Sequence, residues 1–146
     1  MTPTLIGRIQ TRLFLLALVG LPWTLLVTPL LPRDGSADGG VGSLYGMTLV
    51  ALFEVALLGV IVWEPIYHLA QQFRWEKDWP IMFALLVGIP EAVLVWLALP
   101  RSEGSPATVA TFVAHFATTW LLVWLAAIGP VRVFLIRYRF RGGRFL

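Results

Sequence analysis

Four long apolar segments alternate with short polar segments along this chain of 146 residues. The apolar segments cover residues 13–31, 47–67, 80–99 and 107–130. Each is about the 20 residues that a helix rising 1.5 Å per residue needs to cross roughly 30 Å of hydrocarbon. The pattern predicts an all-α integral membrane protein. We expect a single domain of four transmembrane helices in an antiparallel bundle, followed by a basic cytoplasmic tail at residues 131–146.

Prolines are expected to kink two of the predicted helices. Pro22 and Pro29 lie in the first helix, and Pro90 lies in the third. Each lacks the N–H that an α-helix uses and clashes with the preceding turn, so we expect kinks at these positions. In a membrane a carbonyl freed by proline needs another donor, and Thr24 and Thr28 are near enough in the sequence to supply one.

The composition excludes a water-exposed domain and all cysteine chemistry. Hydrophobic residues make up 58% of the chain and charged residues only 13%, which is too few to cover a soluble surface. The chain has no cysteine. Disulfides, thiolate metal sites and cysteine nucleophiles are therefore excluded.

The distribution of basic residues predicts the orientation in the membrane. If both termini lie in the cytoplasm, nine of the 11 lysines and arginines lie on that side, and Arg33 and Arg101 lie outside. Cytoplasmic segments of membrane proteins carry such an excess of positive charge. We therefore expect a multi-pass protein of the plasma (cytoplasmic) membrane, with its N- and C-termini in the cytoplasm.

Three ionisable residues lie inside the apolar segments. Glu54, Glu91 and His115 each lie roughly 10 to 12 Å below the predicted outer boundary, counted at 1.5 Å per residue. A charge near the bilayer centre costs about 2.5 to 3.5 kcal/mol on insertion scales, so such residues face the bundle interior and pair. We expect one intramembrane polar cluster that also includes hydroxyls on the face of the histidine. Its members are Glu54, Glu91, His115, Thr111, Thr118 and Thr119.

The predicted cluster has two interpretations. It can be a hydrogen-bonded knot that only fixes how the helices pack. It can also be a site that holds or relays a proton or an ion near neutral pH. Depth along a helix does not establish contact, so both interpretations stay open at this point.

Polar residues at the cytoplasmic end of the second helix predict contact with lipid headgroups. Glu64 and His68 share a helix face, but no third or fourth metal ligand is evident and Pro65 disturbs the turn. His68 and His115 lie at depths too different for both to ligate one haem iron within one protomer. We therefore expect no metal and no cofactor. The predicted cytoplasmic interface comprises Glu64, His68, Arg74, Trp75, Glu76, Lys77, Asp78 and Trp79. Its connector is an interfacial turn or a docking surface for a partner.

The basic tail alternates arginine with aromatic residues. Its arginines are Arg137, Arg139, Arg141 and Arg144. Anionic lipid attracts a basic residue close to the membrane surface by about 1 kcal/mol. We therefore expect the tail to bind lipid headgroups, with a protein partner as the alternative and no nucleic acid.

These features favour a non-catalytic accessory or assembly subunit of a larger membrane complex. The extramembrane segments are too short to fold alone, and the expected partners are anionic lipids together with other membrane subunits or further copies of the chain. The alternative is a proton-coupled small transporter or ion conduit that uses Glu54, Glu91 and His115. A lipid-modifying enzyme is a further alternative, although no nucleophile, metal set or phosphate-binding loop is evident.

Overall fold

The computed structural model describes residues 4–32, 40–74, 80–100 and 108–134. These residues form helices and the turns that end them, and none of them forms a strand. Four helical stretches are long and apolar enough to cross a membrane. They are Leu5–Leu30, Val41–Gln72, Ile81–Ala98 and Val109–Phe134, called spans one to four below. The prediction of an all-α protein with four candidate membrane-spanning helices is confirmed.

Span one begins at Leu5 rather than at residue 13. Its first helix, α1 (Leu5–Leu15), is capped by Thr4, whose side chain accepts a hydrogen bond of 3.1 Å from the backbone N–H of Gly7. The predicted start was too late because Arg8 and Arg12 interrupt the apolar pattern. In the structure both arginines lie inside the helix.

Spans one and two each contain a turn of π-helix. Span one consists of α1, the π-helical turn η1 (Leu16–Gly20), α2 (Leu21–Val27) and the 3-10 turn η2 (Thr28–Leu30). Span two consists of α3 (Val41–Leu58), the π-helical turn η3 (Gly59–Trp63) and α4 (Glu64–Gln72). Each π-helical turn ends shortly before a proline, Pro22 or Pro65. A π-helical turn rotates the helix that follows it, and such turns are frequent at functional sites.

Pro29 frees a carbonyl that is satisfied by another span. The N–H that proline lacks would have bonded to the carbonyl of Leu25, which instead accepts a hydrogen bond of 2.9 Å from the Tyr45 hydroxyl of span two. Thr28 donates to the carbonyl of Thr24 at 2.6 Å, so the expected threonine compensation serves a neighbouring carbonyl. The proline therefore links span one to span two.

Spans three and four are also interrupted. Span three consists of α5 (Ile81–Leu86) and α6 (Gly88–Ala98), and span four of α7 (Val109–Ile128) and α8 (Pro130–Phe134). Val87 separates the two helices of span three, one turn before Pro90, whose missing N–H leaves the carbonyl of Leu86 without its helical donor. Gly129 separates the two helices of span four.

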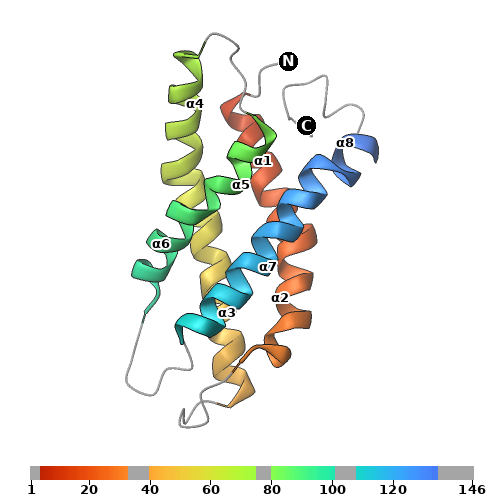
Figure 1. Ribbon diagram of the computed structural model, residues 1–146, viewed down its shortest axis with the longest axis vertical. Helices are drawn as coiled ribbons and strands as arrows, with labels where there is room; N and C mark the ends of the chain where they lie inside the picture. The colour runs from red at the N-terminus through yellow and green to blue at the C-terminus, as the bar shows by residue number, and fades with distance from the viewer. Residues whose placement is uncertain (1–3, 33–39, 75–79, 101–107, 135–146) are drawn as a thin grey trace.

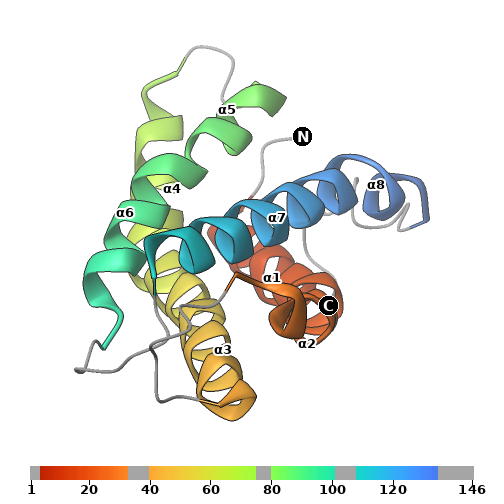
Figure 2. The same ribbon diagram turned by 60° about the horizontal axis from the view of Figure 1, so that its bottom comes forward.

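Figures 1 and 2 show how the spans are arranged. The start of α1, the end of α4, α5 and α8 lie near the end of the bundle where the N-terminus is drawn, called the Arg8 end below. The end of α2 and the start of α3 lie at the opposite end, called the Pro32 end (Figure 1). Helix α7 packs against η1 and α2 of span one, and α3 packs against α6.

The bundle buries several polar side chains and exposes many large apolar ones. Glu91, Thr24, Thr28 and Thr48 are fully buried, whereas many large apolar side chains, such as Leu26 at 68% exposure, face outward. A contiguous apolar exterior is the surface that lipid covers. The apolar core between the spans consists of Leu16, Ala51, Leu52, Val55, Val95, Leu99, Phe112 and Phe116.

Candidate functional site

Charged side chains from three spans meet at Arg12 inside the bundle. The Arg12 Nε donates a hydrogen bond of 2.9 Å to Glu64 Oε1. Its Nη1 donates to Glu91 Oε1, and its Nη2 donates to Glu91 Oε2 at 3.3 Å. The guanidinium thus holds one carboxylate in a bidentate pair and a second carboxylate through its remaining edge.

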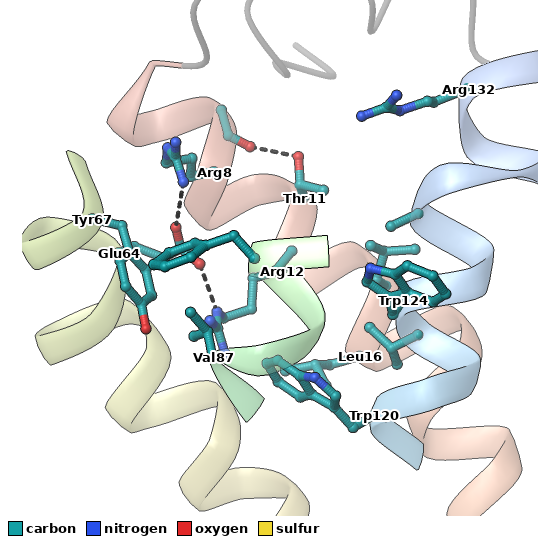
Figure 3. Close-up of a pocket in the computed structure, with 16 residues that line it drawn as sticks. Arg8, Thr11, Arg12, Leu16, Glu64, Tyr67, Val87, Trp120, Trp124 and Arg132 are labelled. Carbon is teal, nitrogen blue, oxygen red and sulfur yellow. Dashed lines mark hydrogen bonds and ion pairs between the residues drawn. The ribbon is translucent and has the colours of Figure 1, made fainter. Parts of the chain in front are cut away.

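A second arginine extends this cluster toward the Arg8 end. Arg8 Nη2 donates a hydrogen bond of 2.6 Å to the side-chain carbonyl of Gln71, and its Nη1 lies 3.8 Å from Glu64 Oε2. Figure 3 shows both arginines reaching Glu64 from α1. We call Arg8, Arg12, Glu64, Glu91 and Gln71 the arginine–carboxylate network. Its two positive charges balance its two negative charges.

The depth of the network explains why its charges are paired. Counted at 1.5 Å per residue from the ends of their spans, Arg12, Glu64 and Glu91 lie about 10 to 15 Å inside the Arg8 end. Glu91 is fully buried, and Glu64 is only 7% exposed. An unpaired charge at such depth costs several kcal/mol, so charged residues there pair with one another and mark functional sites by default.

Backbone features of spans two and three make room for the network. A Cβ atom on Gly59 would overlap the side chain of Arg12, so only glycine lets the arginine pass this close to span two. Gly59 is also the first residue of the π-helical turn η3, which ends just before Glu64. On span three, Glu91 follows Pro90 and the break at Val87. The irregular parts of both helices therefore border the ion pairs.

A pocket of about 290 Å³ lies beside the network. Arg8, Arg12, Glu64 and Tyr67 line one side, and Arg132 of α8 lines it from span four (Figure 3). Gly7 and Thr11 of α1 also line it, and the remaining lining side chains are apolar, namely Leu15, Leu16, Phe83, Ala84, Val87, Trp120, Val123, Trp124 and Ala127. The pocket therefore combines charged groups with an apolar wall, which is the usual composition of a small-molecule site.

Two tryptophans give the apolar wall a fixed orientation. Trp120 Nε1 donates to the carbonyl of Leu85 and Trp124 Nε1 to the carbonyl of Ile81, each at 3.2 Å. Gly88 allows this approach, because a Cβ atom there would overlap the Trp120 indole. The Trp120 ring centroid also lies 5.9 Å from Arg12 Cζ, within reach of a cation–π interaction.

A second set of buried polar groups lies nearer the Pro32 end. Its members pair through hydrogen bonds and form no ion pair with any described residue. Thr24 Oγ1 and His115 Nε2 are 2.9 Å apart, and Thr28 Oγ1 and Thr48 Oγ1 are 2.9 Å apart. We call these four residues the threonine–histidine set. They join spans one, two and four by neutral hydrogen bonds.

A small void lies between the two polar regions. Its volume is about 10 Å³, close to the smallest space that holds one water molecule, and it is lined by His115, Thr119 and apolar residues. The Thr119 hydroxyl is buried and has no hydrogen-bond partner among the described residues. The void and the larger pocket share the lining residues Leu16, Trp120 and Val123.

The structure divides the predicted intramembrane cluster. Glu91 bonds to Arg12, whereas His115 bonds to Thr24, so these two predicted members belong to different polar regions. Glu54 is half-buried on span two, and no described residue forms a hydrogen bond or ion pair with it. Its depth had been counted from residue 47, but span two begins at Val41, and the longer helix changes its position along the bundle.

The predicted threonines also have separate partners. Thr111 is buried and donates to the carbonyl of Pro32 at 2.6 Å, and Thr119 lines the small void. Thr118 is exposed and accepts a hydrogen bond of 3.1 Å from Trp23 Nε1. Helical spacing alone did not distinguish these three environments.

The predicted cytoplasmic interface contains one residue that the structure places in the interior. Glu64 is a buried member of the network rather than a headgroup contact, because span two continues to Gln72 and carries it inside. His68 and Arg74 are half-buried. Trp75, Glu76, Lys77, Asp78 and Trp79, and the tail arginines Arg137, Arg139, Arg141 and Arg144, lie outside the described residues.

The sequence prediction missed Arg8, Arg12 and Gln71. Arg8 and Arg12 were counted as charges in front of the first helix, but their i, i+4 spacing places them on one helix face. Two carboxylates inside the membrane also call for cations at similar depth. These two signals together identify the arginines as partners.

Four apolar spans that enclose a charged network indicate a multi-pass membrane protein. No protein-family model, no curated protein and no solved structure matches this chain. Among the described residues, no group of three histidine, aspartate or glutamate side chains is placed to hold a metal ion.

Proposed function

We propose that this chain is a small proton-coupled membrane transporter. The pocket beside Arg12 is the binding site, and Glu64 and Glu91 are the coupling carboxylates. The observation that carries this proposal is that carboxylates from two different spans share one guanidinium at the wall of a pocket. Glu91 keeps the role that the sequence suggested, while Arg12 and Glu64 replace His115 and Glu54 as its partners.

The two carboxylates that share Arg12 can each be ionised and bonded to it, or protonated and held more weakly. When both are ionised, Arg12 ties span two and span three to span one. A proton on either carboxylate weakens its bond to Arg12 and leaves the other pair intact, so the spans can separate one at a time. A ligand or proton shifts such an equilibrium only if it interacts differently with the two states, and protonation of a paired carboxylate meets this condition.

The threonine–histidine set supports a route for protons from the Pro32 end. Its hydroxyls and imidazole lead to the small void beside Thr119, and that void adjoins the pocket at Leu16 and Trp120. One water in the void can accept and donate hydrogen bonds between these groups. In this proposal protons enter from the Pro32 end and reach Glu91 past His115.

The proposed topology follows from the charge distribution. With the bundle antiparallel and both termini in the cytoplasm of a plasma membrane, the Arg8 end is cytoplasmic. The pocket then opens toward the cytoplasm, and the threonine–histidine set faces the other side.

Proton movement in reconstituted vesicles tests this proposal. Proteoliposomes that contain a pH-sensitive dye are mixed with the small-molecule fraction of a cell extract, and the internal pH is followed. We expect a pH change with the wild type and with Glu54→Gln, a matched acid on span two outside the network. We expect a loss of about tenfold or more with Glu64→Gln and Glu91→Gln. Unfolding midpoints of all four proteins separate loss of transport from loss of fold.

Absence of any pH change with the folded wild type, or an equal change with Glu91→Gln, would contradict the transporter proposal. A glutamine keeps the size and part of the hydrogen bonding of each carboxylate but cannot take up a proton. The two variants therefore isolate protonation from packing.

The second candidate function is a subunit of a larger membrane assembly, and Glu54 favours it. This acid lies within span two beside the exposed side chains of Phe53 and Leu57. A half-buried acid next to lipid is costly unless a neighbouring chain covers it. Because the chain has no cysteine, Glu54→Cys creates one reactive site. Cross-linking into homodimers supports self-assembly, and co-purified different chains support a hetero-complex.

A further inference from the structure

Arg132 brings a positive charge to the pocket that the network does not balance. It lines the pocket from α8, and its side chain is exposed (Figure 3). Among the described residues none forms a hydrogen bond or ion pair with it. Because Arg8 and Arg12 are already matched by Glu64 and Glu91, the described residues around the pocket carry one net positive charge.

The two outer cations of the pocket come from different spans. Figure 3 shows Arg8 on α1 and Arg132 on α8 on opposite sides of the pocket. The Arg8 side chain is 16% exposed, and its guanidinium already bonds to Gln71, so it keeps a fixed position. An anion between these two arginines meets a positioned guanidinium on one side and an adjustable one on the other.

The opposite part of the pocket presents an apolar surface to a ligand. The indole N–H groups of Trp120 and Trp124 bond to backbone carbonyls, so neither ring offers a free donor to a ligand. The Trp120 ring also stacks on Phe116 with a centroid distance of 5.7 Å, which fixes its orientation. Leu16, Val87 and Val123 complete this surface. The tryptophans cannot rotate to present a donor without losing these hydrogen bonds.

We infer that the pocket binds an amphipathic anion. Its carboxylate or phosphate group lies between Arg8 and Arg132, and its short apolar chain lies against Trp120 and Trp124. This inference rests on the proposed function, because it names the substrate class of the same pocket. The volume of about 290 Å³ is at the lower end for small-molecule sites, which limits the bound part to a headgroup and a short chain.

Three ligands that share an octyl chain but differ in headgroup test whether the pocket requires a negative charge. Octyl phosphate, octyl glucoside and octyltrimethylammonium are titrated into the purified full-length protein in neutral detergent, and binding is measured by calorimetry. We expect octyl phosphate to bind about tenfold more tightly than the other two. Arg132→Gln removes most of this difference, whereas Arg74→Gln, an arginine outside the pocket lining, keeps it.

Equal affinities for the three ligands, or an unchanged preference in a folded Arg132→Gln protein, would overturn the inference. Arg132 is exposed, so its substitution leaves the packing of the spans intact, and equal unfolding midpoints check this. If Arg132→Lys restores the preference, the charge rather than the guanidinium shape is responsible.

The anionic group can come from a membrane lipid or from a soluble compound, and a competition experiment distinguishes the sources. The protein is reconstituted into vesicles of phosphatidylglycerol or of phosphatidylcholine and extracted again before native mass spectrometry. Retained phosphatidylglycerol that octyl phosphate displaces indicates a lipid ligand. Octyl phosphate bound without retained lipid indicates a soluble one. Anion binding without proton movement rejects the transporter proposal alone, and proton movement without anion preference rejects this inference alone.

Discussion

The two polar regions inside this bundle satisfy their buried groups in different ways. In the arginine–carboxylate network, ionised side chains from three spans converge on Arg12 beside a pocket of about 290 Å³. In the threonine–histidine set, hydroxyls and one imidazole form neutral pairs next to a void of about 10 Å³. The charged region borders open space, and its two carboxylates share one guanidinium. The neutral region borders only the small void.

The two regions differ in how strongly they respond to the loss of one group. Breaking one ionic contact leaves an uncompensated charge in a medium of low dielectric constant, whereas breaking one neutral hydrogen bond leaves a single hydroxyl. Loss of one group should therefore cost several times more in the network than in the threonine–histidine set. The same sensitivity makes the network responsive to a proton or a charged ligand.

The largest expected effect is that of Arg12→Met. Removing the guanidinium leaves Glu64 and Glu91 buried without their main cation, and the free energy of unfolding should fall by about 3 to 5 kcal/mol. Unfolding in mixed micelles, followed by circular dichroism, measures this change. Arg132→Met, at an exposed arginine outside the network, should cost less than about 0.5 kcal/mol. A loss of less than about 1 kcal/mol for Arg12→Met would show that the carboxylates are not held by this arginine.

A smaller effect is expected from Gly59→Ala, which keeps every charge but removes the space for Arg12. The added methyl group overlaps the arginine side chain and should destabilise the protein by about 1 to 3 kcal/mol. Gly46→Ala in the same span is the matched control, because no other side chain lies within 4 Å of the added carbon. It should leave stability unchanged or raise it. Equal effects of the two substitutions would place Arg12 away from span two.

The smallest effect is expected from Thr24→Val in the neutral region. This variant removes the partner of His115 but leaves no charge unpaired, so the cost should be about 0.6 to 1.7 kcal/mol. Thr24→Ser retains the hydroxyl and should recover most of that loss. A cost comparable to that of Arg12→Met would remove the distinction between the two regions.

The four spans could be predicted from the sequence, but the pairing of their polar groups could not. About 20 consecutive apolar residues identify a span whatever its neighbours are. The partner of Glu91 depends instead on how far span one extends and on its rotation against span three. In the sequence Arg12 directly precedes the apolar run that starts at Leu13, so it resembles a charge that flanks the helix. In the structure the helix is capped by Thr4 and already begins at Leu5.

The positions of Glu64 and His115 depended on details that an apolar pattern does not contain. The π-helical turn η3 ends immediately before Glu64, and one additional residue in a turn rotates everything after it. His115 was placed correctly in the interior, where it is 2% exposed, but its partner is a threonine of span one. Burial follows from helix periodicity, whereas contact requires the register between helices.

A double-mutant cycle measures whether Arg12 and Glu91 form one ionic unit inside the bundle. Free energies of unfolding are measured for the wild type, Arg12→Met, Glu91→Gln and the double variant. We expect that neutralising Glu91 relieves part of the cost of losing Arg12, with a coupling energy of about 1 to 3 kcal/mol. Additive costs, as expected for a parallel cycle of Arg12→Met with Glu54→Gln, would contradict it.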